Sequence, residues 1–234
     1  AEMTMTTKKS SAVSSLLAIF CLLLATAQRG VYADDDDKPV TCGSAVKFTH
    51  VESATSTNVP HYLHSEEKQL GGGGSGQQIV TWMNDKASRG SLWWIRGAND
   101  LEQECPPGQP LKCGDTIRLT HLETKKNLHT HAFSSPLSKQ QEITAFGQGD
   151  GRGDGGDDWI VECTNKNQMW TRGSKFRLLH RDTQKYLGAS SNVKFTQQNC
   201  GHSCPILNHL EAFGRRQVDS FGELKVELGI HLSQ

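Results

Sequence analysis

The stretch Cys113-Gly-Asp-Thr-Ile-Arg-Leu-Thr-His121 decides the fold, because the chain contains a version of it three times. Residues 42–50 read CGSAVKFTH, and residues 172–180 read RGSKFRLLH. Each copy has a glycine, then alternating apolar and polar residues, then a histidine, and this alternation is typical of a half-buried β-strand. The chain is therefore predicted to use one short β unit three times.

Further short strands follow each copy in a constant order. In the first repeat they are residues 61–64, 77–81 and 93–96, and in the second they are 127–131, 140–144 and 159–162. The third repeat has weaker equivalents at 186–188, 207–213 and 224–226. The predicted repeats span residues 42–98, 111–164 and 170–229. Recurrence of several elements in one order makes chance a poor explanation.

These units predict an all-β fold. Three copies can stack as an open array, which needs polar caps at its ends, or they can close around a pseudo-threefold axis. Closure removes exposed strand edges, and the sequence shows no capping helices. We therefore expect a single domain over residues 42–234, a pseudo-threefold β-trefoil of about twelve short strands in which three hairpins cap a barrel.

The first 33 residues have the pattern of a signal peptide. Lys8 and Lys9 precede an apolar segment at 16–27, and candidate cleavage sites end at Ala27 and at Ala33, of which the second is favoured. A signal anchor is the alternative, but the apolar segment is short for a membrane span. Cleavage after residue 33 would leave residues 34–41 as an acidic mature N-terminus and no membrane span beyond it.

Cysteines indicate an oxidising compartment. Seven are present, and six remain once the leader with Cys21 is removed. Six cysteines allow 15 connectivities. The repeats favour one hypothesis, in which one disulfide closes each of the first two repeats and the last two cysteines pair locally. The pairs would be Cys42 with Cys105, Cys113 with Cys163, and Cys200 with Cys204.

Charge and motifs argue against several functions. The formal net charge is zero, whereas nucleic-acid binding needs a basic surface, so no nucleic-acid partner is expected. The sequence lacks a Gly-x-Ser-x-Gly nucleophile motif, a His-Glu-x-x-His zinc motif and a cofactor fingerprint. These observations predict a binding protein without a catalytic site or cofactor.

The repeats resemble a known family. The likeness spans residues 40–229 and is strongest in the first two repeats. The chain resembles the stromal cell-derived factor 2-like family, whose members carry three MIR motifs. The segments that carry the resemblance are 42–47, 74–81, 113–122, 127–131, 134–138, 141–147 and 157–161.

The resemblance implies a β-trefoil in the lumen of the endoplasmic reticulum. It also implies association with a lumenal J-domain co-chaperone that keeps unfolded clients soluble. Protein O-mannosyltransferases carry the same domain, so mannose-type glycans are candidate ligands. Family members commonly end in a KDEL-type tetrapeptide, whereas this chain ends Ile230-His-Leu-Ser-Gln234. The predicted location is therefore the endoplasmic reticulum lumen or the exterior.

Histidines and tryptophans supply the candidate contact residues. His50, His121 and His180 recur at one position and are interpreted as structural. Alternating imidazoles in Leu128-His-Thr-His131 would point to one face, which can bind a metal. The first repeat has only one matching histidine and the third has Gly188, so no metal site is assigned.

Trp94 and Trp159 recur and are predicted to lie in the core, whereas Trp82, Trp93 and Trp170 do not recur. An exposed tryptophan is a platform for a sugar ring or an unfolded peptide. The resulting candidates for ligand or partner contact are His64, Trp82, His129, His131 and Trp170.

Function is expected where the copies disagree, which is in three loops at residues 71–76, 147–158 and 200–204. The second loop, Gly147-Gln-Gly-Asp-Gly-Arg-Gly-Asp-Gly-Gly-Asp-Asp158, lacks the Lys-Ser/Thr of a phosphate loop and the final Glu of a calcium loop. It is predicted to be a surface turn.

Together these features predict a non-catalytic protein of the secretory pathway. The first hypothesis is quality control in the endoplasmic reticulum, with a J-domain co-chaperone and unfolded or O-mannosylated clients. The alternative is a secreted carbohydrate-binding β-trefoil.

Overall fold

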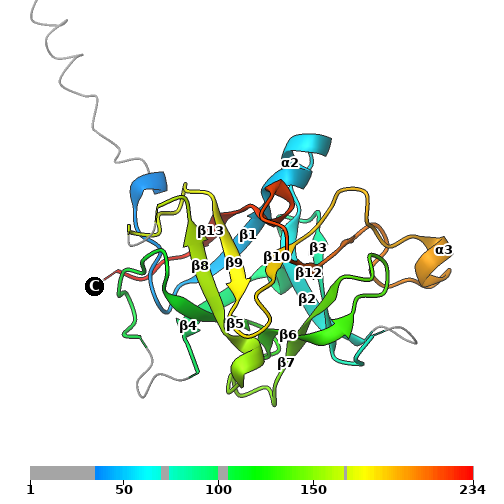
Figure 1. Ribbon diagram of the computed structural model, residues 1–234, viewed down its shortest axis with the longest axis horizontal. Helices are drawn as coiled ribbons and strands as arrows, with labels where there is room; N and C mark the ends of the chain where they lie inside the picture. Colours follow the sequence, from blue (N-terminus) through cyan, green and yellow to red (C-terminus); the bar gives the residue numbers. More distant parts are fainter. Residues whose placement is uncertain (1–34, 70–73, 100–104, 166–167, 234) are drawn as a thin grey trace, which may run out of the picture. The chain divides into compact units, whose positions relative to one another are not determined.

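The computed structural model describes residues 35–69, 74–99, 105–165 and 168–233. The chain divides into two units, Ala1–Asp35 and Asp36–Gln234. The predicted signal peptide lies in the first unit, outside the described residues. All described strands belong to the second unit (Figure 1).

The strands follow the order that the repeats predict. Lobes one, two and three are defined here as the parts formed by residues 42–98, 111–164 and 170–229. Lobe one contains β1 (Ala45–His50), α2 (Val51–Thr57), β2 (Tyr62–Gln69), β3 (Gln78–Met83), η2 (Arg89–Ser91) and β4 (Trp93–Gly97). Lobe two contains β5 (Thr116–His121), β6 (Asn127–Ser134), β7 (Gln141–Phe146), η3 (Gly155–Asp157) and β8 (Trp159–Cys163). Lobe three contains β9 (Phe176–His180), β10 (Tyr186–Gly188), α3 (Gln197–Cys200), β11 (Leu210–Glu211), β12 (Phe213–Arg215), η4 (Ser220–Gly222) and β13 (Leu224–Ile230). A 3-10 turn, η1 (Asp35–Asp37), precedes them.

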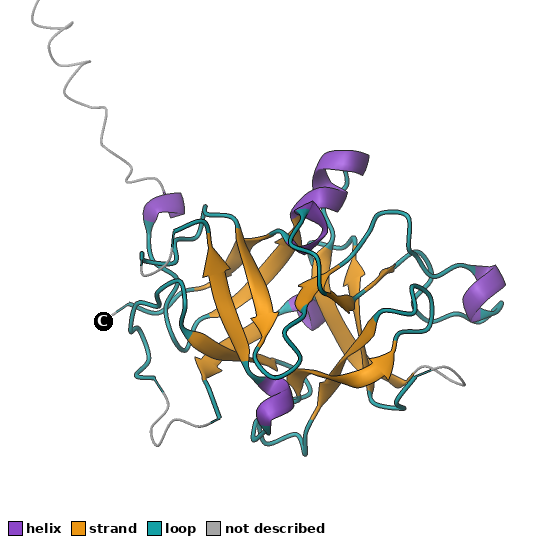
Figure 2. Ribbon diagram, in the orientation of Figure 1, coloured by secondary structure: helices purple, strands orange, loops and turns teal. Residues whose placement is uncertain are grey.

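All described strands belong to one antiparallel sheet of 13 strands, and short helices lie at its margins (Figure 2). Ten of the strands pair in a closed circuit. Its order is β1, β2, β3, β7, β12, β10, β9, β8, β5, β4 and back to β1. The other three, β6, β11 and β13, pair with members of this barrel.

The all-β prediction is confirmed, but the predicted β-trefoil is wrong. It expected hairpins that cap a separate barrel, whereas hairpin strands are members of the closed ten-strand circuit. Pairing of β3 with β7, and of β7 with β12, joins the hairpins of all three lobes. The physical reason is that an unpaired hairpin edge exposes N–H and C=O groups, and pairing across lobes satisfies them.

Helix α2 was not predicted from the sequence. The polar residues after His50 form helix α2 rather than a loop. The ring of His50 caps this helix, since its Nδ1 accepts the main-chain N–H of Ser53 at 3.3 Å. Asn58, in the left-handed conformation with φ 55°, ends it. A single histidine therefore ends a strand and starts a helix.

Two tryptophans hold equivalent places in the core. The indole Nε1–H of Trp93 donates to the main-chain oxygen of Leu63 at 2.9 Å, and that of Trp159 donates to Leu128 at 3.0 Å. Both side chains are fully buried. The sequence comparison paired Trp94 with Trp159 instead, which was wrong by one residue. Trp93 pairs with His121 as Trp159 pairs with His180, and Trp94 is only half-buried.

Three disulfides staple the lobes, and they join the pairs of the sequence hypothesis. They are Cys42–Cys105, Cys113–Cys163 and Cys200–Cys204, with Cα–Cα distances of 6.0, 5.6 and 5.2 Å. The first two close long segments of 63 and 50 residues. By loop entropy alone each stabilises the fold by about 4 kcal/mol.

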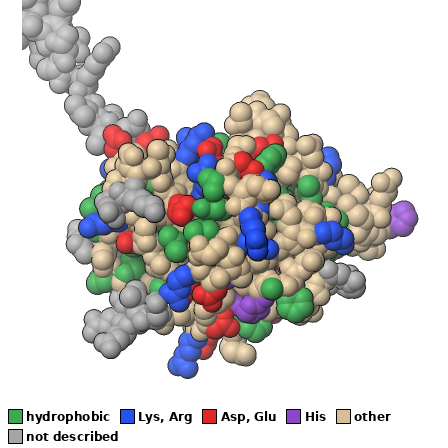
Figure 3. Space-filling model, in the orientation of Figure 1, with side chains coloured by type: hydrophobic (Ala, Val, Ile, Leu, Met, Phe, Trp, Pro, Cys, Tyr) green, Lys and Arg blue, Asp and Glu red, His purple; other side chains and the backbone are tan. Residues whose placement is uncertain are grey.

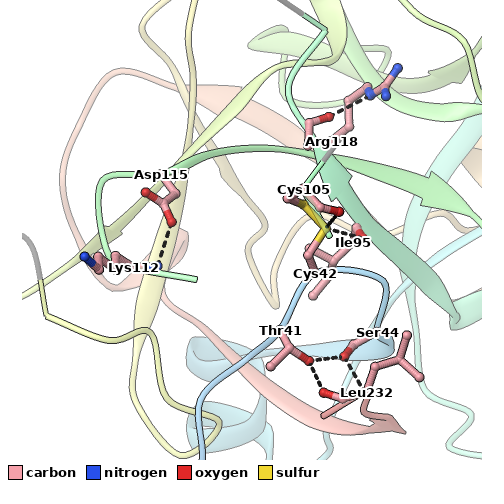
Figure 4. The surroundings of a disulfide bond; sticks show 10 residues. Thr41, Cys42, Ser44, Ile95, Cys105, Lys112, Asp115, Arg118 and Leu232 are labelled. Atoms are coloured by element: carbon pink, nitrogen blue, oxygen red, sulfur yellow. Dashed lines mark hydrogen bonds between the residues drawn. A yellow bond between two sulfur atoms is a disulfide. The ribbon is translucent and has the colours of Figure 1, made fainter. Parts of the chain in front are cut away.

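The turn beside Cys42 also anchors the end of the chain (Figure 4). Ser44 and Thr41 share a hydroxyl contact of 2.7 Å, and the Thr41 hydroxyl donates to the main-chain oxygen of Leu232 at 2.6 Å. The N–H of Leu232 donates back to Ser44 Oγ at 3.1 Å. These bonds tie the C-terminal segment to the start of lobe one.

Hairpin loops are held by the next lobe along the chain. Glu142 of lobe two accepts the N–H of Ser75 from lobe one at 3.0 Å, and Glu211 of lobe three accepts the N–H of Ser138 from lobe two at 2.8 Å. Ile79 of lobe one packs in an apolar cluster with Phe195 and Ile206 of lobe three. Polar clamps therefore hold two loops, while hydrophobic packing joins lobe one to lobe three.

Candidate functional site

Only one of the five candidate contact residues is exposed. Trp82 and Trp170 are 0% exposed and belong to the core, so the expectation of an exposed tryptophan was wrong. His64 and His129 are also buried, and His131 alone reaches the surface. Failure to recur marks a difference between lobes, but a tryptophan that does not recur can still pack inside the sheet.

The three recurring histidines are part of the scaffold. His50, His121 and His180 are all buried, and each lies opposite the first residue of the strand that ends a lobe. Burial lowers the pKa of all three below the ordinary value of 6.5. They are therefore neutral at physiological pH and act as hydrogen-bonding spacers.

A glutamine from the preceding lobe supports two of these histidines. Gln78 donates to the hydroxyl of Thr124 at 3.0 Å, and that hydroxyl contacts Nδ1 of His121 at 2.9 Å. The same chain recurs one lobe further on, from Gln141 through Thr183 to His180. The recurring Gln and His side chains thus connect neighbouring lobes.

The hairpin of lobe two presents a different surface. The register of β6 against β7 shifts between Thr130 and Ser134, so the residues between them leave the regular ladder. His131 and Phe133 are exposed there, and Phe133 is 54% exposed. Phe146 of β7, which is 39% exposed, lies 5.0 Å from His129 between ring centroids. In Figure 3 a histidine near the lower edge lies among acidic and hydrophobic side chains.

Turn η3 packs against the ring of His129 and holds it in place. The carboxylate of Asp157, which is 1% exposed, lies 2.7 Å from Nδ1 of His129 and also accepts Nδ2 of Asn127 at 3.0 Å. Gly156 is needed for this approach, because a Cβ there would lie 2.4 Å from Cε1 of His129. A carboxylate facing Nδ1 selects the tautomer that carries the proton there, so Nε2 keeps its lone pair.

His129 has two further polar neighbours. The ring of His131 stands edge-on to it at 4.1 Å between centroids. An oxygen of Asp154 lies 3.7 Å from His129 Nδ1 and also accepts the N–H of Gly156 at 2.8 Å. One ligand atom from each of His129, His131 and Asp154 lies within 4.8 Å of the others. This group has the donor types of a transition-metal site.

Lobe one has the same framework with different side chains. His64 occupies the place of His129, and a Cβ on Gly90 would lie 2.5 Å from its Cε1. Its Nδ1 contacts the hydroxyl of Ser91 at 3.3 Å and that of Ser88 at 3.5 Å. Burial, together with nearby His209 and His121, lowers the pKa of His64 to about 4.

Lobe three lacks the histidine altogether. Gly188 occupies its place, and a Cβ there would lie 2.5 Å from the main-chain oxygen of Phe221. Glu66 and His131, the residues two positions after the buried histidine, also differ between lobes one and two. In lobe two the second histidine and both carboxylates come from the same lobe, whereas the second histidine beside His64 is His209 of lobe three, at 5.5 Å between ring centroids.

Sequence reasoning missed Asp154, Asp157, Phe133 and Phe146. A signal was present for the acidic pair. Once Trp93 is aligned with Trp159, the tetrapeptide Ser88-Arg-Gly-Ser91 aligns with Asp154-Gly-Gly-Asp157. Both polar positions then change from a hydroxyl to a carboxylate, and the alignment on Trp94 concealed this.

Comparison with known proteins places this framework in a family. The family model of the MIR domain matches residues 40–203, which include both histidine positions. The chain belongs to the MIR-domain family. The stromal cell-derived factor 2-like protein of Dictyostelium discoideum is 38% identical over 221 residues, covering 94% of this chain and 97% of the relative.

Two solved structures have a similar fold. The SDF2-like protein of Arabidopsis thaliana is 30% identical, with a TM-score of 0.71 over 84% of this chain and 98% of that one. The S. cerevisiae protein O-mannosyltransferase Pmt1–Pmt2 complex bound to the sugar donor has a TM-score of 0.65 at 22% identity, over 94% of this chain and 32% of that one. This last likeness concerns the fold alone.

The described part of this MIR-domain protein contains no helix that is both long and apolar enough to cross a membrane. The predicted functional loop at 71–76 lies partly outside the described residues, which resume at residue 74. Residues 147–158 supply Asp154 and Asp157, and the loop at 200–204 is closed by its own disulfide. The second of the three predicted loops is therefore the one that joins the histidine pair.

Proposed function

We propose that this MIR-domain protein is a non-catalytic binding protein of the secretory pathway. It acts in protein quality control with a lumenal J-domain co-chaperone and unfolded or O-mannosylated clients. The observation that carries the proposal is the exposure of His131, Phe133 and Phe146 on the hairpin of lobe two. Exposed aromatic side chains on one hairpin favour contact with a partner.

The use of the polar residues supports a binding role over catalysis. The recurring His121 and His180 contact threonine hydroxyls inside the lobe junctions, and His64 contacts a buried serine. A nucleophile–base pair has to reach its substrate. These pairs are engaged in the scaffold, so their geometry supports stability.

Three features support the secretory location. The predicted leader at 1–33 would be removed, and the acidic segment 34–41 would precede a single mature domain at 42–234. The three disulfides suit an oxidising compartment. The proposal covers retention in the endoplasmic reticulum lumen, with secretion as the alternative location.

A carbohydrate-binding module is the second candidate. The observation that favours it is the exposed ring of Phe146, which lies 5.0 Å from the ring of His129, whose Nδ1 is 3.7 Å from the carboxylate of Asp154. An aromatic face beside a hydrogen-bond acceptor is a common sugar platform. The likeness to an O-mannosyltransferase complex makes mannose the first glycan to test.

Affinity capture with mass spectrometry tests the proposal. The tagged protein is incubated with a secretory-pathway extract beside the variant Phe133→Ser/Phe146→Ser and a control, Val218→Ser, which changes a 62% exposed residue of lobe three. We expect the wild type and the control to recover a J-domain protein with its clients. The double variant should recover at least about 10-fold less J-domain protein, because an aromatic hot spot contributes about 2 kcal/mol to binding.

Recovery of no J-domain protein or chaperone by the wild type would contradict the first candidate. A glycan array that includes mannose tests the second, and silence on that array would end it. Binding to the array that is lost in the double variant would instead favour the carbohydrate-binding module.

A further inference from the structure

The strongest unassigned group is the histidine pair of lobe two. His129 is 0% exposed, and its Nε2 has no hydrogen-bond partner among the described residues. A buried nitrogen without a hydrogen-bond partner destabilises the fold. Such an atom calls for an occupant, and a lone pair on imidazole is a common ligand for metal ions.

The environment of His129 is that of a metal ligand. Its Nδ1 faces the buried carboxylate of Asp157 at 2.7 Å, and Asp157 is in turn held by Asn127 and by the N–H of Asp154. A carboxylate behind a histidine orients the ring and raises the basicity of the other nitrogen. This arrangement fixes the orientation of the His129 ring in the absence of a metal ion.

Two exposed side chains can complete the donor set. One imidazole nitrogen of His129, one of His131 and one carboxylate oxygen of Asp154 already lie within 4.8 Å of one another. Ligands around a tetrahedral zinc ion are about 3.4 Å apart, because each Zn–N distance is about 2.1 Å. The Asp154 oxygen lies 3.7 Å from Nδ1 of His129, so this side chain has to turn toward Nε2. His131 is exposed and the Asp154 side chain is 54% exposed, so both have room to change rotamer.

Lobe one serves as an internal control. There the buried histidine faces Ser91 instead of Asp157, Ser88 stands in place of Asp154, and Glu66 stands in place of His131. The glycine-backed pocket for the ring is the same in both lobes. Two of these differences put a carboxylate in place of a hydroxyl, and the third puts an imidazole in place of a carboxylate; a carboxylate and two imidazoles suit a zinc-type ion.

We propose that His129, His131 and Asp154 bind one divalent transition-metal ion of the zinc type, with Asp157 as the positioning residue. Two imidazoles and a carboxylate leave one coordination position open toward solvent. Metal binding by the purified chain needs no partner, so this site goes beyond the proposed function and does not depend on it.

The test is calorimetric titration of the purified, chelator-treated protein with Zn²⁺, paired with elemental analysis. We expect one Zn²⁺ per chain in the wild type. His131→Ala and Asp154→Ser change exposed residues, so we expect both variants to fold, and each should weaken Zn²⁺ binding at least 10-fold. Asp157→Asn should weaken it by about 10- to 100-fold. His64→Gln is the matched control and should bind as the wild type does.

Thermal unfolding of each variant establishes that the fold is retained. Imidazole nitrogen resonances give a second readout, in which Zn²⁺ should shift Nε2 of His129 and leave His64 unchanged. The proposal is overturned if the wild type binds no stoichiometric Zn²⁺, or if either exposed variant keeps the wild-type affinity. Adventitious binding elsewhere on the surface would produce the latter result.

Discussion

His64 and His129 occupy the same place in two copies of one scaffold, yet their surroundings differ. Both rings rest on a glycine of a 3-10 turn, and both are buried. His64 contacts two hydroxyls and lies edge-on to His209 at 5.5 Å, whereas His129 faces the Asp157 carboxylate and lies edge-on to His131 at 4.1 Å. The repeated framework therefore fixes where a ring sits, and a few side chains around it decide what the ring can do.

The largest expected effect concerns the shared framework. Trp93→Ala and Trp159→Ala should each lower the free energy of unfolding by about 3–5 kcal/mol, because each removes a fully buried indole. Chemical denaturation measures this. Trp94→Ala is the control, and it should cost much less because Trp94 is half-buried. An equal cost for Trp93 and Trp94 would show that the two lobes are not aligned as described.

A second effect is the contribution of His64 to the pH dependence of stability. Because the folded pKa of about 4 lies below the ordinary 6.5, the unfolded chain binds more protons between these values. His64 therefore lowers stability as pH falls from 6.5 to 4, by about 3 kcal/mol in all. Urea titrations at pH 7 and pH 4.5 should show a smaller pH loss for His64→Gln than for the wild type. Equal losses would mean that the ring is not held neutral.

The glycines behind the rings should matter equally in both lobes. Gly90→Ala and Gly156→Ala place a Cβ at 2.5 and 2.4 Å from the histidine Cε1 atoms. Each should destabilise the protein by about 1–3 kcal/mol, since overpacking forces the ring or turn to shift. Gly201→Ala, at a glycine of positive φ with no atom within 4 Å of an added Cβ, measures the cost of backbone strain without a clash. A cost in only one lobe would break the equivalence of the pockets.

The smallest stability effect is expected at the residues that distinguish lobe two. His131→Glu and Asp154→Ser introduce the residues of lobe one at exposed positions. Each should change the free energy of unfolding by no more than about 0.5 kcal/mol. Thermal denaturation without metal checks this. A loss well above that value would assign these residues to the scaffold.

Much of the scaffold could be predicted from the sequence, because strand alternation and turn glycines are local signals. The order of the strands and the pairing of Cys113 with Cys163 followed from the repeats. The closed ten-strand circuit could not be predicted, since pairing of β3 with β7 depends on contacts between lobes. The β-trefoil expectation failed at that step.

The candidate site was harder to predict, because its residues come from separate elements. His131 stands on β6, while Asp154 and Asp157 belong to a glycine-rich loop that has no regular period. Alternation predicted that His129 and His131 share a face, and the ring contact at 4.1 Å agrees with this. Burial of Trp82 and Trp170 could not be inferred from their failure to recur.

The most direct test of the central claim, that lobe two alone has a specialised ring environment, is the number of Zn²⁺ ions bound per chain. Elemental analysis compares the wild type with the double variant His131→Glu/Asp154→Ser, which gives lobe two the exposed residues of lobe one. We predict one ion in the wild type and none in the variant. An unchanged count in the variant, or a count in the wild type that depends on His64, would contradict the account.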